Sequence, residues 1–446
     1  MSNNNDTIFA PLTIKGKCSV YVIRISGSKT IYCMEQLGIK KKLKHKVATL
    51  CNLKDEKNDI LDNALVIYFE NPNSFTGEDV CELNLHCSTY IINKVFKILS
   101  SIDGVRLAER GEFSKRAFLN GKFDLIQAES IVDLVNAETE LQHKQAIDQL
   151  NGKNSKFFDN LRDDILNISS NIEAIIDFPE DDIDINLINK IKNDIQNTAN
   201  KMEGILQDNK VGEKIKDGLN ISIIGEPNVG KSSFLNFLAK KDVAIVSNIA
   251  GTTRDIVNVA LDIDGILVNF YDTAGIRETS DVIEQEGVKR AIVNAKDADL
   301  KILIISPENI NINENILNLI DDKTIILLNK IDTINLNKIN NIKEKYKDIV
   351  EMSIKNNINL DYVISRIKEY IQSMINPYIG TNITQERYRK EIVNALDSLQ
   401  SINFDLPIEI VAEKVRLASF AIGTITGRIN TEEILGNIFG KFCIGK

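Results

Sequence analysis

Apolar residues in the first quarter of the chain form short runs that turn residues interrupt. The runs at 20–25 and 64–69 are each followed by a turn signal, Ser-Gly in one case and Asn-Pro in the other, as strands usually are. Residues 90–99 instead repeat their apolar positions with the spacing of a helix. Residues 1–118 therefore predict an α+β domain.

Beyond residue 119 the apolar positions recur every three or four residues, which is the pattern of amphipathic helices. Two such seams lie at 161–175 and 188–205. Near the other end of the chain, Pro407 opens a further helix whose apolar face extends to Ala418. We therefore expect helical segments on both sides of the region between them.

In that central region, apolar strands alternate with segments of helix length. This alternation predicts a parallel sheet with helices on both faces, and so an α/β domain inserted into a helical one. The expected strands are 221–224, 267–271, 300–305 and 324–328. The predicted fold class is multidomain α/β plus α+β, with an N-terminal domain at 1–118, a helical domain in two parts at 119–217 and 373–446, and the inserted domain at 218–372.

The composition excludes some classes of function. Lys and Arg number 54 against 63 Asp and Glu, a net charge of −9, which argues against a protein held on nucleic acid or anionic lipid mainly by bulk positive charge. No apolar run approaches the length of a bilayer-spanning helix, and the first residues lack the basic start and apolar core of a signal peptide. We expect a cytoplasmic protein that does not enter a membrane.

The cysteines show neither a CxxC pair nor a metal-binding spacing with histidine. Buried or incidental reduced thiols are therefore a better interpretation than a disulfide framework or a zinc site. The six positions are Cys18, Cys33, Cys51, Cys81, Cys87 and Cys443.

The strongest chemical signal is GEPNVGKS at 225–232, a complete GxxxxGK[ST] motif. It lies between an expected strand and an expected helix, where glycines let backbone amides turn toward phosphate oxygens at a helix N-terminus. Lys231 would reach the outer phosphates, and Ser232 would offer its hydroxyl to Mg²⁺. In this context an ordinary Gly-rich turn is a poor alternative.

Two further motifs follow in the order that a nucleotide site needs. DTAG at 272–275 comes after the next strongly apolar strand, where its Asp can support the Mg²⁺ shell and its Gly amide can meet the terminal phosphate. NKID at 329–332 comes after the strand at 324–328. The Asp332 carboxylate can accept two hydrogen bonds from guanine that adenine cannot supply, while Asn329 would satisfy neighbouring polar groups and the Lys330 stem would lie on the base. Guanine is therefore the expected base.

These motifs, in this order, resemble the GTPase superfamily, so the inserted domain is expected to be a Ras-like P-loop GTPase domain. Residues 243–255 contain the tandem threonine of a loop that closes over the terminal phosphate, and Thr253 is expected on Mg²⁺. Ile276 stands where signalling GTPases carry a water-orienting Gln. Because an aliphatic side chain cannot orient water, hydrolysis must be arranged differently here.

Asn228 together with GTTRD at 251–255 is similar to the potassium-activated GTPases, in which K⁺ supplies positive charge where an arginine finger would otherwise act. The resemblance implies that Glu284 orients the attacking water, with Lys231 and Thr253 as the other catalytic residues; without it, Glu284 would be a solvated helix carboxylate. The K⁺ ligands implied are Asn228, Ser247, Ile249 and Thr252. The GTP-binding residues implied are Asn228, Val229, Gly230, Lys231, Ser232, Ser233, Ser247, Asn248, Ile249, Ala250, Gly251, Thr252, Thr253, Asp272, Thr273, Ala274, Gly275, Asn329, Lys330 and Asp332.

The two ends of the chain narrow the resemblance to one family. The motifs are DTI at 6–8, IRISG at 23–27, NSFTGED at 73–79, GEFSKRAFLNGK at 111–122 and the terminal FCIGK at 442–446. Together they resemble the MnmE (TrmE) family of tRNA-modification GTPases over the whole chain. A generic GTPase would not end in a CxGK tail.

This resemblance implies an N-terminal domain that dimerises and binds formyl- or methylene-tetrahydrofolate. It also implies action with an FAD-dependent partner, as a heterotetramer, to install an aminomethyl or carboxymethylaminomethyl group at carbon 5 of the wobble uridine in tRNA. The folate-binding positions would be Arg24, Glu82, Lys122 and Lys446. Two Lys, one Arg and one carboxylate suit an anionic folate tail and a pterin ring. Cys443 would be either a reactive thiol or a packed small residue.

Two segments depart from the family pattern. Residues 11–19, PLTIKGKCS, contain fewer glycines than the family's usual loop, and LHCS at 85–88 replaces its His-Gly-Gly run. The competing interpretation of the chain is a ribosome-assembly or signalling GTPase whose flanking domains recruit RNA or protein. The CxGK tail and the expected folate-binding residues favour the tRNA-modification GTPase over this alternative.

Overall fold

The computed structural model of this 446-residue chain has two compact units, Met1–Val132 with Phe420–Lys446, and Asp133–Ser419. This grouping is coarser than the four-segment division of the sequence, which stays a prediction. The residues described are 6–14, 16, 18–177, 185–208, 210–241, 244–245, 259–272, 293, 295–310, 312–334, 339, 342, 346, 348–375, 383–429 and 432–445. Among them, no helix is long and apolar enough to cross a membrane.

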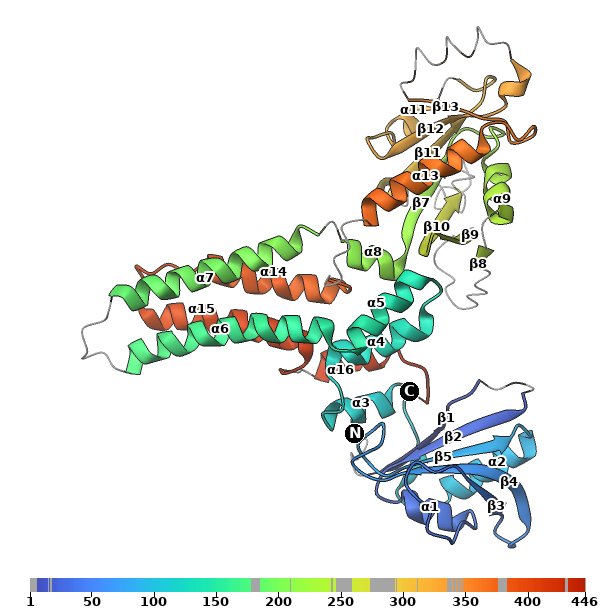
Figure 1. The fold of residues 1–446 in the computed structure, drawn as a ribbon, viewed down its shortest axis with the longest axis vertical. Helices are drawn as coiled ribbons and strands as arrows, with labels where there is room; N and C mark the ends of the chain where they lie inside the picture. The colour runs from blue at the N-terminus through green and yellow to red at the C-terminus, as the bar shows by residue number, and fades with distance from the viewer. Residues whose placement is uncertain are drawn as a thin grey trace, which may run out of the picture. The chain divides into compact units, whose positions relative to one another are not determined.

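The first unit is built on a six-stranded sheet, as the α+β prediction requires (Figure 1). Its strand order is β3-β4-β5-β2-β1-β6, with β1 and β6 parallel and the other neighbours antiparallel. The strands are β1 (Thr7–Pro11), β2 (Val20–Ser26), β3 (Thr49–Lys54), β4 (Ile60–Phe69), β5 (Val80–His86) and β6 (Val105–Leu107).

The two faces of this sheet differ in how they are covered. Helices α1 (Thr30–Gln36) and α2 (Thr89–Ser100) pack on one face and close an apolar core there. On the other face, Phe113 from α3 (Glu112–Leu119) covers β1 with Phe75. Farther along that face, toward β3, Leu65 remains exposed.

The C-terminal segment returns to this unit. Helix α16 (Glu432–Phe439) packs against α3 and α4 (Leu125–Asn136) in a small apolar cluster. Gly111 allows the close approach, because a Cβ at its φ of +66° would meet the Phe439 carbonyl oxygen at 2.4 Å. The tail after α16 is therefore held beside the start of α3.

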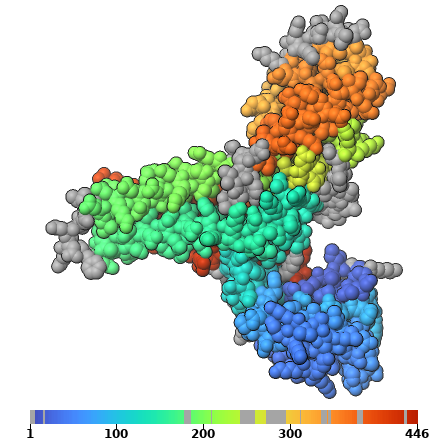
Figure 2. All heavy atoms as spheres, in the orientation of Figure 1, coloured from blue at the N-terminus to red at the C-terminus, as the bar shows by residue number. Residues whose placement is uncertain are grey.

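The helical part of the second unit follows the predicted seams. Helix α6 (Lys153–Asp177) packs along α7 (Ile185–Leu206), and α14 (Glu386–Gln400) packs on α7. Helix α5 (Glu140–Leu150) adjoins α6, and α15 (Ile408–Thr426) begins directly after Pro407, as predicted. Figure 1 shows α6 and α7 running side by side, and in Figure 2 their side chains form a continuous surface.

The α/β part of the second unit has a seven-stranded sheet of order β13-β12-β11-β7-β10-β9-β8. Its strands are β7 (Leu219–Ile224), β8 (Ala244–Ile245), β9 (Val259–Ile263), β10 (Ile266–Asp272), β11 (Leu300–Ile305), β12 (Thr324–Leu328) and β13 (Val350–Glu351). The remaining short elements are α8 (Val211–Asp217), α9 (Lys231–Lys241), α11 (Glu314–Leu317), the 3₁₀ helix η1 (Ile331–Thr333) and α13 (Leu360–Ile375).

The prediction of a purely parallel sheet is wrong at one edge. Strands β7, β10, β11, β12 and β13 are parallel, but β9 pairs antiparallel with β10, and β8 with β9. The reason is a tight hairpin turn at Asp264 and Gly265, which both have positive φ. The Asp-Gly dipeptide could have predicted this antiparallel pairing from the sequence, because it favours a two-residue hairpin loop.

Helix α8 joins the helical part to the first strand of the α/β part. Arg389 of α14 donates to Asp208 at 2.8 Å, to Glu213 of α8 at 3.0–3.2 Å and to the Leu206 carbonyl at 3.3 Å. Burial alone would lower the pKa of Arg389, but these carboxylates outweigh it and raise that pKa. These hydrogen bonds of Arg389 fix the position of α8. Because β7 starts at Leu219, directly after α8, they also help to set where that strand enters the sheet.

Candidate functional sites

The nucleotide motifs meet at one edge of the α/β sheet. Strands β7, β10, β11 and β12 are parallel, so their carboxyl ends lie together, and in such sheets ligands bind outside these ends. GEPNVGKS follows β7, Asp272 ends β10 opposite Ile223 of β7, and Asn329 follows β12. The order of the motifs along the chain does not show which strands are neighbours, whereas the sheet does.

The loop at 225–232 has a backbone shape that its glycines make possible. A Cβ on Gly225 would lie 2.2 Å from the Ile304 carbonyl oxygen, and one on Gly230 would lie 2.2 Å from Asn329 Nδ2. Asn228 has φ +62° and an exposed side chain at the tip of the loop. The loop is thus a close-packed turn leading into the N-terminus of α9, a geometry that suits phosphate oxygens.

Lys231, the first residue of α9, folds back over the loop. Its ammonium donates to the carbonyls of Gly225 at 2.8 Å and Glu226 at 3.0 Å, and the residue is buried. A buried cation inside a turn of backbone amides is the donor set that a polyphosphate requires. Ser232 and Ser233, in the same helical turn, are exposed.

Asn329 connects the two halves of the site. Its side chain is buried, and Nδ2 donates to the Val229 carbonyl at 2.8 Å while Oδ1 accepts from the Ile354 amide at 3.3 Å. The phosphate loop, the end of β12 and the segment after β13 are therefore joined through one amide side chain.

The side chains beside Asn329 form the expected base-recognition end. Asp332 is exposed in η1, and its Oδ1 accepts a hydrogen bond from Ser353 Oγ at 2.6 Å. Lys330 has φ +62°, and its ammonium lies 3.3 Å from Glu308. Since the Ser353 hydroxyl orients the Asp332 carboxylate, Ser353 takes a positioning role at this end of the site.

Two residues of the site were missed by the motif analysis. The Glu226 carboxylate accepts from the Asn313 amide at 2.9 Å, and Asn309 Nδ2 donates to the Pro227 carbonyl at 3.2 Å. Both asparagines follow β11, so they support the phosphate loop from its side. No motif marks them, because their pairing depends on which strand lies next to β7.

Many of the expected ligands lie outside the described residues. For Asp272 only the backbone is described. The other positions outside are Ser247, Asn248, Ile249, Ala250, Gly251, Thr252, Thr253, Thr273, Ala274, Gly275, Glu284 and Lys446. Their assigned roles stay predictions.

In the first unit, Arg24 and Glu82 face each other across β2 and β5. Arg24 donates to one Glu82 oxygen from Nε at 3.0 Å and from an Nη at 2.8 Å. The guanidinium also lies 4.9 Å from the Phe75 ring centre and 5.5 Å from that of Phe113. An arginine held between two aromatic rings beside a carboxylate is a rigid donor on the less covered face of the sheet.

Lys122 contacts the loop that carries Phe75, the residue against which Arg24 lies. Its exposed ammonium donates to the Pro72 carbonyl at 2.8 Å, and Asn120 donates to the Thr76 carbonyl at 2.7 Å. Phe75 also packs on Phe123, with ring centres 6.0 Å apart. The loop at 72–76 thus holds Arg24 on one side and Lys122 on the other.

The C-terminal tail reaches the same region. Ile444 forms a bridge with Arg110, and a Cβ on Gly445 would lie only 2.0 Å from the Pro11 carbonyl oxygen. Pro11 is the partner of Ile23, the residue before Arg24. The tail therefore lies against the end of β1, the strand that pairs with the strand of Arg24, while the Cys443 side chain is exposed.

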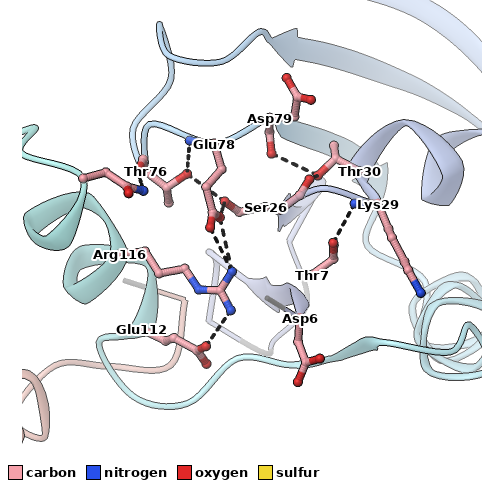
Figure 3. A network of polar contacts seen from close by, with 12 residues as sticks. Asp6, Thr7, Ser26, Lys29, Thr30, Thr76, Glu78, Asp79, Glu112 and Arg116 are labelled. Carbon is pink, nitrogen blue, oxygen red and sulfur yellow. Dashed lines mark hydrogen bonds and ion pairs between the residues drawn. The ribbon is translucent and has the colours of Figure 1, made fainter. Parts of the chain in front are cut away.

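A buried polar network supports this region (Figure 3). Arg116 of α3 donates to Glu78 at 3.1 Å and to Glu112 at 2.9 Å. Glu78 in turn accepts from Ser26 Oγ at 2.6 Å, and Ser26 shares a hydrogen bond with Thr76. The network links β2, the loop before β5 and α3, and so fixes the frame on which Arg24 and Lys122 are held.

We expect Glu112→Gln to destabilise the first unit by about 3 kcal/mol, because it leaves the buried Arg116 and the half-buried Arg106 poorly compensated. Burial alone would raise the pKa of Glu112, but hydrogen bonds from Arg106, the Glu109 amide and Arg116 outweigh it and lower that pKa. The stabilisation that the carboxylate provides is therefore fully present above its ordinary pKa of 4.5. It is lost as the pH falls through the lowered pKa of Glu112 in the folded chain. Hydrogen exchange of β1 and α3 measures the local opening free energy.

The matched control is Glu413→Gln, which removes the exposed partner of Arg416 and should change exchange little. The loss in Glu112→Gln should also shrink as the pH falls through the lowered pKa of Glu112, where the native carboxyl loses its charge. Equal exchange in the two variants at neutral pH would contradict this role of the network.

Comparison with known proteins identifies the family. The family model "MnmE helical domain" matches residues 125–443, and "GTP-binding protein TrmE N-terminus" matches residues 7–122. The protein named "tRNA modification GTPase MnmE" from Rickettsia bellii (strain OSU 85-389) is 48% identical over 99% of this chain and 100% of its own length. The chain belongs to the MnmE family. The likewise named protein from Rickettsia conorii (strain ATCC VR-613 / Malish 7) is 47% identical over the same shares.

Membership in the MnmE family confirms the expectation drawn from the motifs at the two ends of the chain, as well as the predicted fold class. The described geometry also suits the group of ligands that the MnmE resemblance implied. Narrow turns at Gly225 and Gly230 suit a polyphosphate, and the Arg24–Glu82 pair suits a ligand with both anionic and donor groups.

Proposed function

We propose that this chain is the GTP-hydrolysing component of a complex that adds an aminomethyl or carboxymethylaminomethyl group to carbon 5 of the wobble uridine of certain tRNAs. The one-carbon unit comes from a formyl- or methylene-tetrahydrofolate. The observation that carries the proposal is the arrangement in the first unit: Arg24 of β2 pairs with Glu82, and the tail at Gly445 lies against Pro11 of the neighbouring strand β1. Full-length similarity to proteins named tRNA modification GTPases supports the GTPase part.

The residues of the second unit divide the work on GTP by chemistry. Lys231 and the backbone amides of the loop after β7 bind the phosphates, while Asp332, oriented by Ser353, accepts hydrogen bonds from guanine. Ser232 and Thr253 are the proposed Mg²⁺ ligands. Asn228, Ser247, Ile249 and Thr252 are the proposed K⁺ ligands. Both cations supply positive charge at the phosphates when bound, and Glu284 orients the attacking water.

The less covered sheet face of the first unit supports the proposal that the chain acts as a homodimer. Leu50 and Leu65 are partners on β3 and β4 and lie on the same face as Glu82, and they are 67% and 42% exposed. An apolar patch of this kind is typical of a surface that pairs with another. An FAD-dependent partner, forming a heterotetramer with the dimer, and tRNA complete the proposed assembly in the cytoplasm.

Binding of 5-formyltetrahydrofolate to the purified chain tests the proposal. Lys122→Gln removes an exposed cation without touching the buried network, and we expect it to raise the Kd about tenfold or more, as loss of a charge-assisted hydrogen bond would. Arg24→Gln should weaken binding further, because the guanidinium is held rigidly between two rings. Titration calorimetry measures both.

Arg416→Gln in the second unit is the matched control and should bind like the unaltered chain, since Arg416 pairs with Glu413, three positions before it, on an exposed helix surface. The alternative, a ribosome-assembly or signalling GTPase, predicts no folate binding in any variant. That result, with GTP hydrolysis intact, would refute the folate part and favour the alternative.

A further inference from the structure

The two segments that depart from the family pattern lie next to each other in the fold. Strands β2 and β5 pair antiparallel as far as Val20 and His86. The loop that precedes β2 and the residues that follow β5 therefore emerge from the sheet at the same end. Each segment brings one cysteine to this place, Cys18 and Cys87.

The two thiols are in contact. Their Sγ atoms are 3.2 Å apart, and Cys18 donates its proton toward the Cys87 sulfur. This hydrogen bond raises the pKa of the Cys18 thiol. Cys87 is also 3.1 Å from the Gly16 carbonyl, so it contacts the loop at a second point. A disulfide has an S–S length of about 2.05 Å, so a closure of roughly 1.2 Å would bond the two sulfurs.

Accessibility separates this pair from the other thiols. Cys18 is exposed and Cys87 is half-buried, whereas Cys33, Cys51 and Cys81 are buried. Burial raises the pKa of Cys33 to about 12 and that of Cys81 well above its usual range, and it also keeps both thiols out of reach of a small oxidant. Cys443 is exposed, but it lies in the C-terminal tail, where its carbonyl accepts a hydrogen bond from the Gly111 amide. A small oxidant can thus reach both members of one pair.

We propose that Cys18 and Cys87 are a reversible redox site, oxidised to a disulfide by a low-molecular-weight disulfide, and that the bond fixes the loop between β1 and β2 beside the folate site. One thiolate attacks the small disulfide RSSR, forms a mixed disulfide and releases one RS⁻. The second cysteine sulfur, after losing its proton, displaces the second RS⁻. The chain loses two protons and two electrons, and RSSR is reduced to two RSH.

The position of the loop links the pair to the folate site, a step that rests on the proposed function. At its start, the Leu12 amide donates to the Val22 carbonyl at 2.8 Å, and Thr13 Oγ1 accepts from the Val22 amide at 3.1 Å. Val22 is two residues from Arg24 and on the same sheet face. A bond at Cys18 would hold the far end of the loop as well. The oxidised chain should therefore pay less ordering entropy when folate binds.

Peptide mapping tests the redox site without any reference to folate. The full-length chain is incubated with glutathione disulfide, blocked with N-ethylmaleimide and digested without reduction. We expect a cross-linked peptide pair joining Cys18 to Cys87, lost in Cys18→Ser and in Cys87→Ser, retained in Cys443→Ser, and reversed by dithiothreitol. Separate glutathione adducts on both cysteines, or full alkylation of both without a cross-link, would overturn the site.

Folate binding tests the link to the loop. Oxidised chain should bind 5-formyltetrahydrofolate about three- to tenfold more tightly than reduced chain, as expected for a pre-ordered loop. Cys18→Ser should show one affinity under both conditions. Unchanged or weaker binding after cross-linking would overturn the effect on the loop while the disulfide stands. Absence of folate binding in both states would instead refute the proposed function, and the mapping result would remain valid.

Discussion

Asp332→Asn is expected to move the nucleotide preference of this chain from guanine to xanthine. The carboxylate accepts hydrogen bonds from the guanine ring N–H and amino group, whereas an amide can donate to the carbonyl that xanthine carries in place of that amino group. Two charge-assisted hydrogen bonds are at stake, so GTP affinity should fall by about 100-fold to 1,000-fold. Competition between GTP and xanthosine triphosphate for a fluorescent analogue measures the change.

Ser353→Ala is the matched control for this substitution. It removes the hydroxyl that lies 2.6 Å from the Asp332 carboxylate but leaves the carboxylate itself. Affinity for GTP should therefore fall modestly, with no gain for xanthosine triphosphate. If Asp332→Asn kept full preference for GTP, the assignment of the base-binding carboxylate would be wrong.

Replacing K⁺ by Na⁺ is expected to slow GTP turnover by roughly two orders of magnitude or more, because charge placed where an arginine finger acts is worth about 10³–10⁵ in rate. Asn228 is the described member of the proposed ligand set. Its φ of +62° makes Asn228→Gly the sharpest variant, since Gly keeps this backbone conformation while removing the side-chain oxygen. The variant should hydrolyse GTP at the same slow rate in both salts.

Glu284→Ala provides the comparison for the catalytic step. It should lower turnover while leaving nucleotide affinity nearly intact, and its residual rate should still respond to K⁺. Single-turnover hydrolysis under both salts, with nucleotide binding measured separately, distinguishes the two variants. Equal rates of the unaltered chain in K⁺ and Na⁺ would count against the role of Asn228.

Local patterns predicted much of the α/β part because local chemistry specifies it. The strand before Gly225 and the helix after it were expected from a continuous apolar run and a glycine-rich turn, and β7 and α9 occupy those places. The edge of the same sheet was mispredicted. The antiparallel pairing of β9 with β10 depends on a two-residue turn at Asp264 and Gly265, whose positive φ values match the twist of a hairpin.

The candidate folate site could be predicted only in part. Its residue types follow from motifs, but nothing in the local sequence places Arg24 between Phe75 and Phe113. These contacts require that β2, the loop before β5 and α3 be packed together. The buried ion pair of Arg116 with Glu112 helps to hold these segments together, because loss of either partner would leave an uncompensated charge in the interior.

By itself, the sequence determined the family, the periodic elements and the phosphate-binding loop, since each depends on residues that are neighbours along the chain. Only the tertiary structure decided which distant groups meet: Asn329 with the carbonyl of Val229, and Cys18 with Cys87, 69 positions away. Such pairs are set by strand order and register, because shifting a strand by a single residue turns its side chains to the opposite face of the sheet. No local pattern encodes that choice.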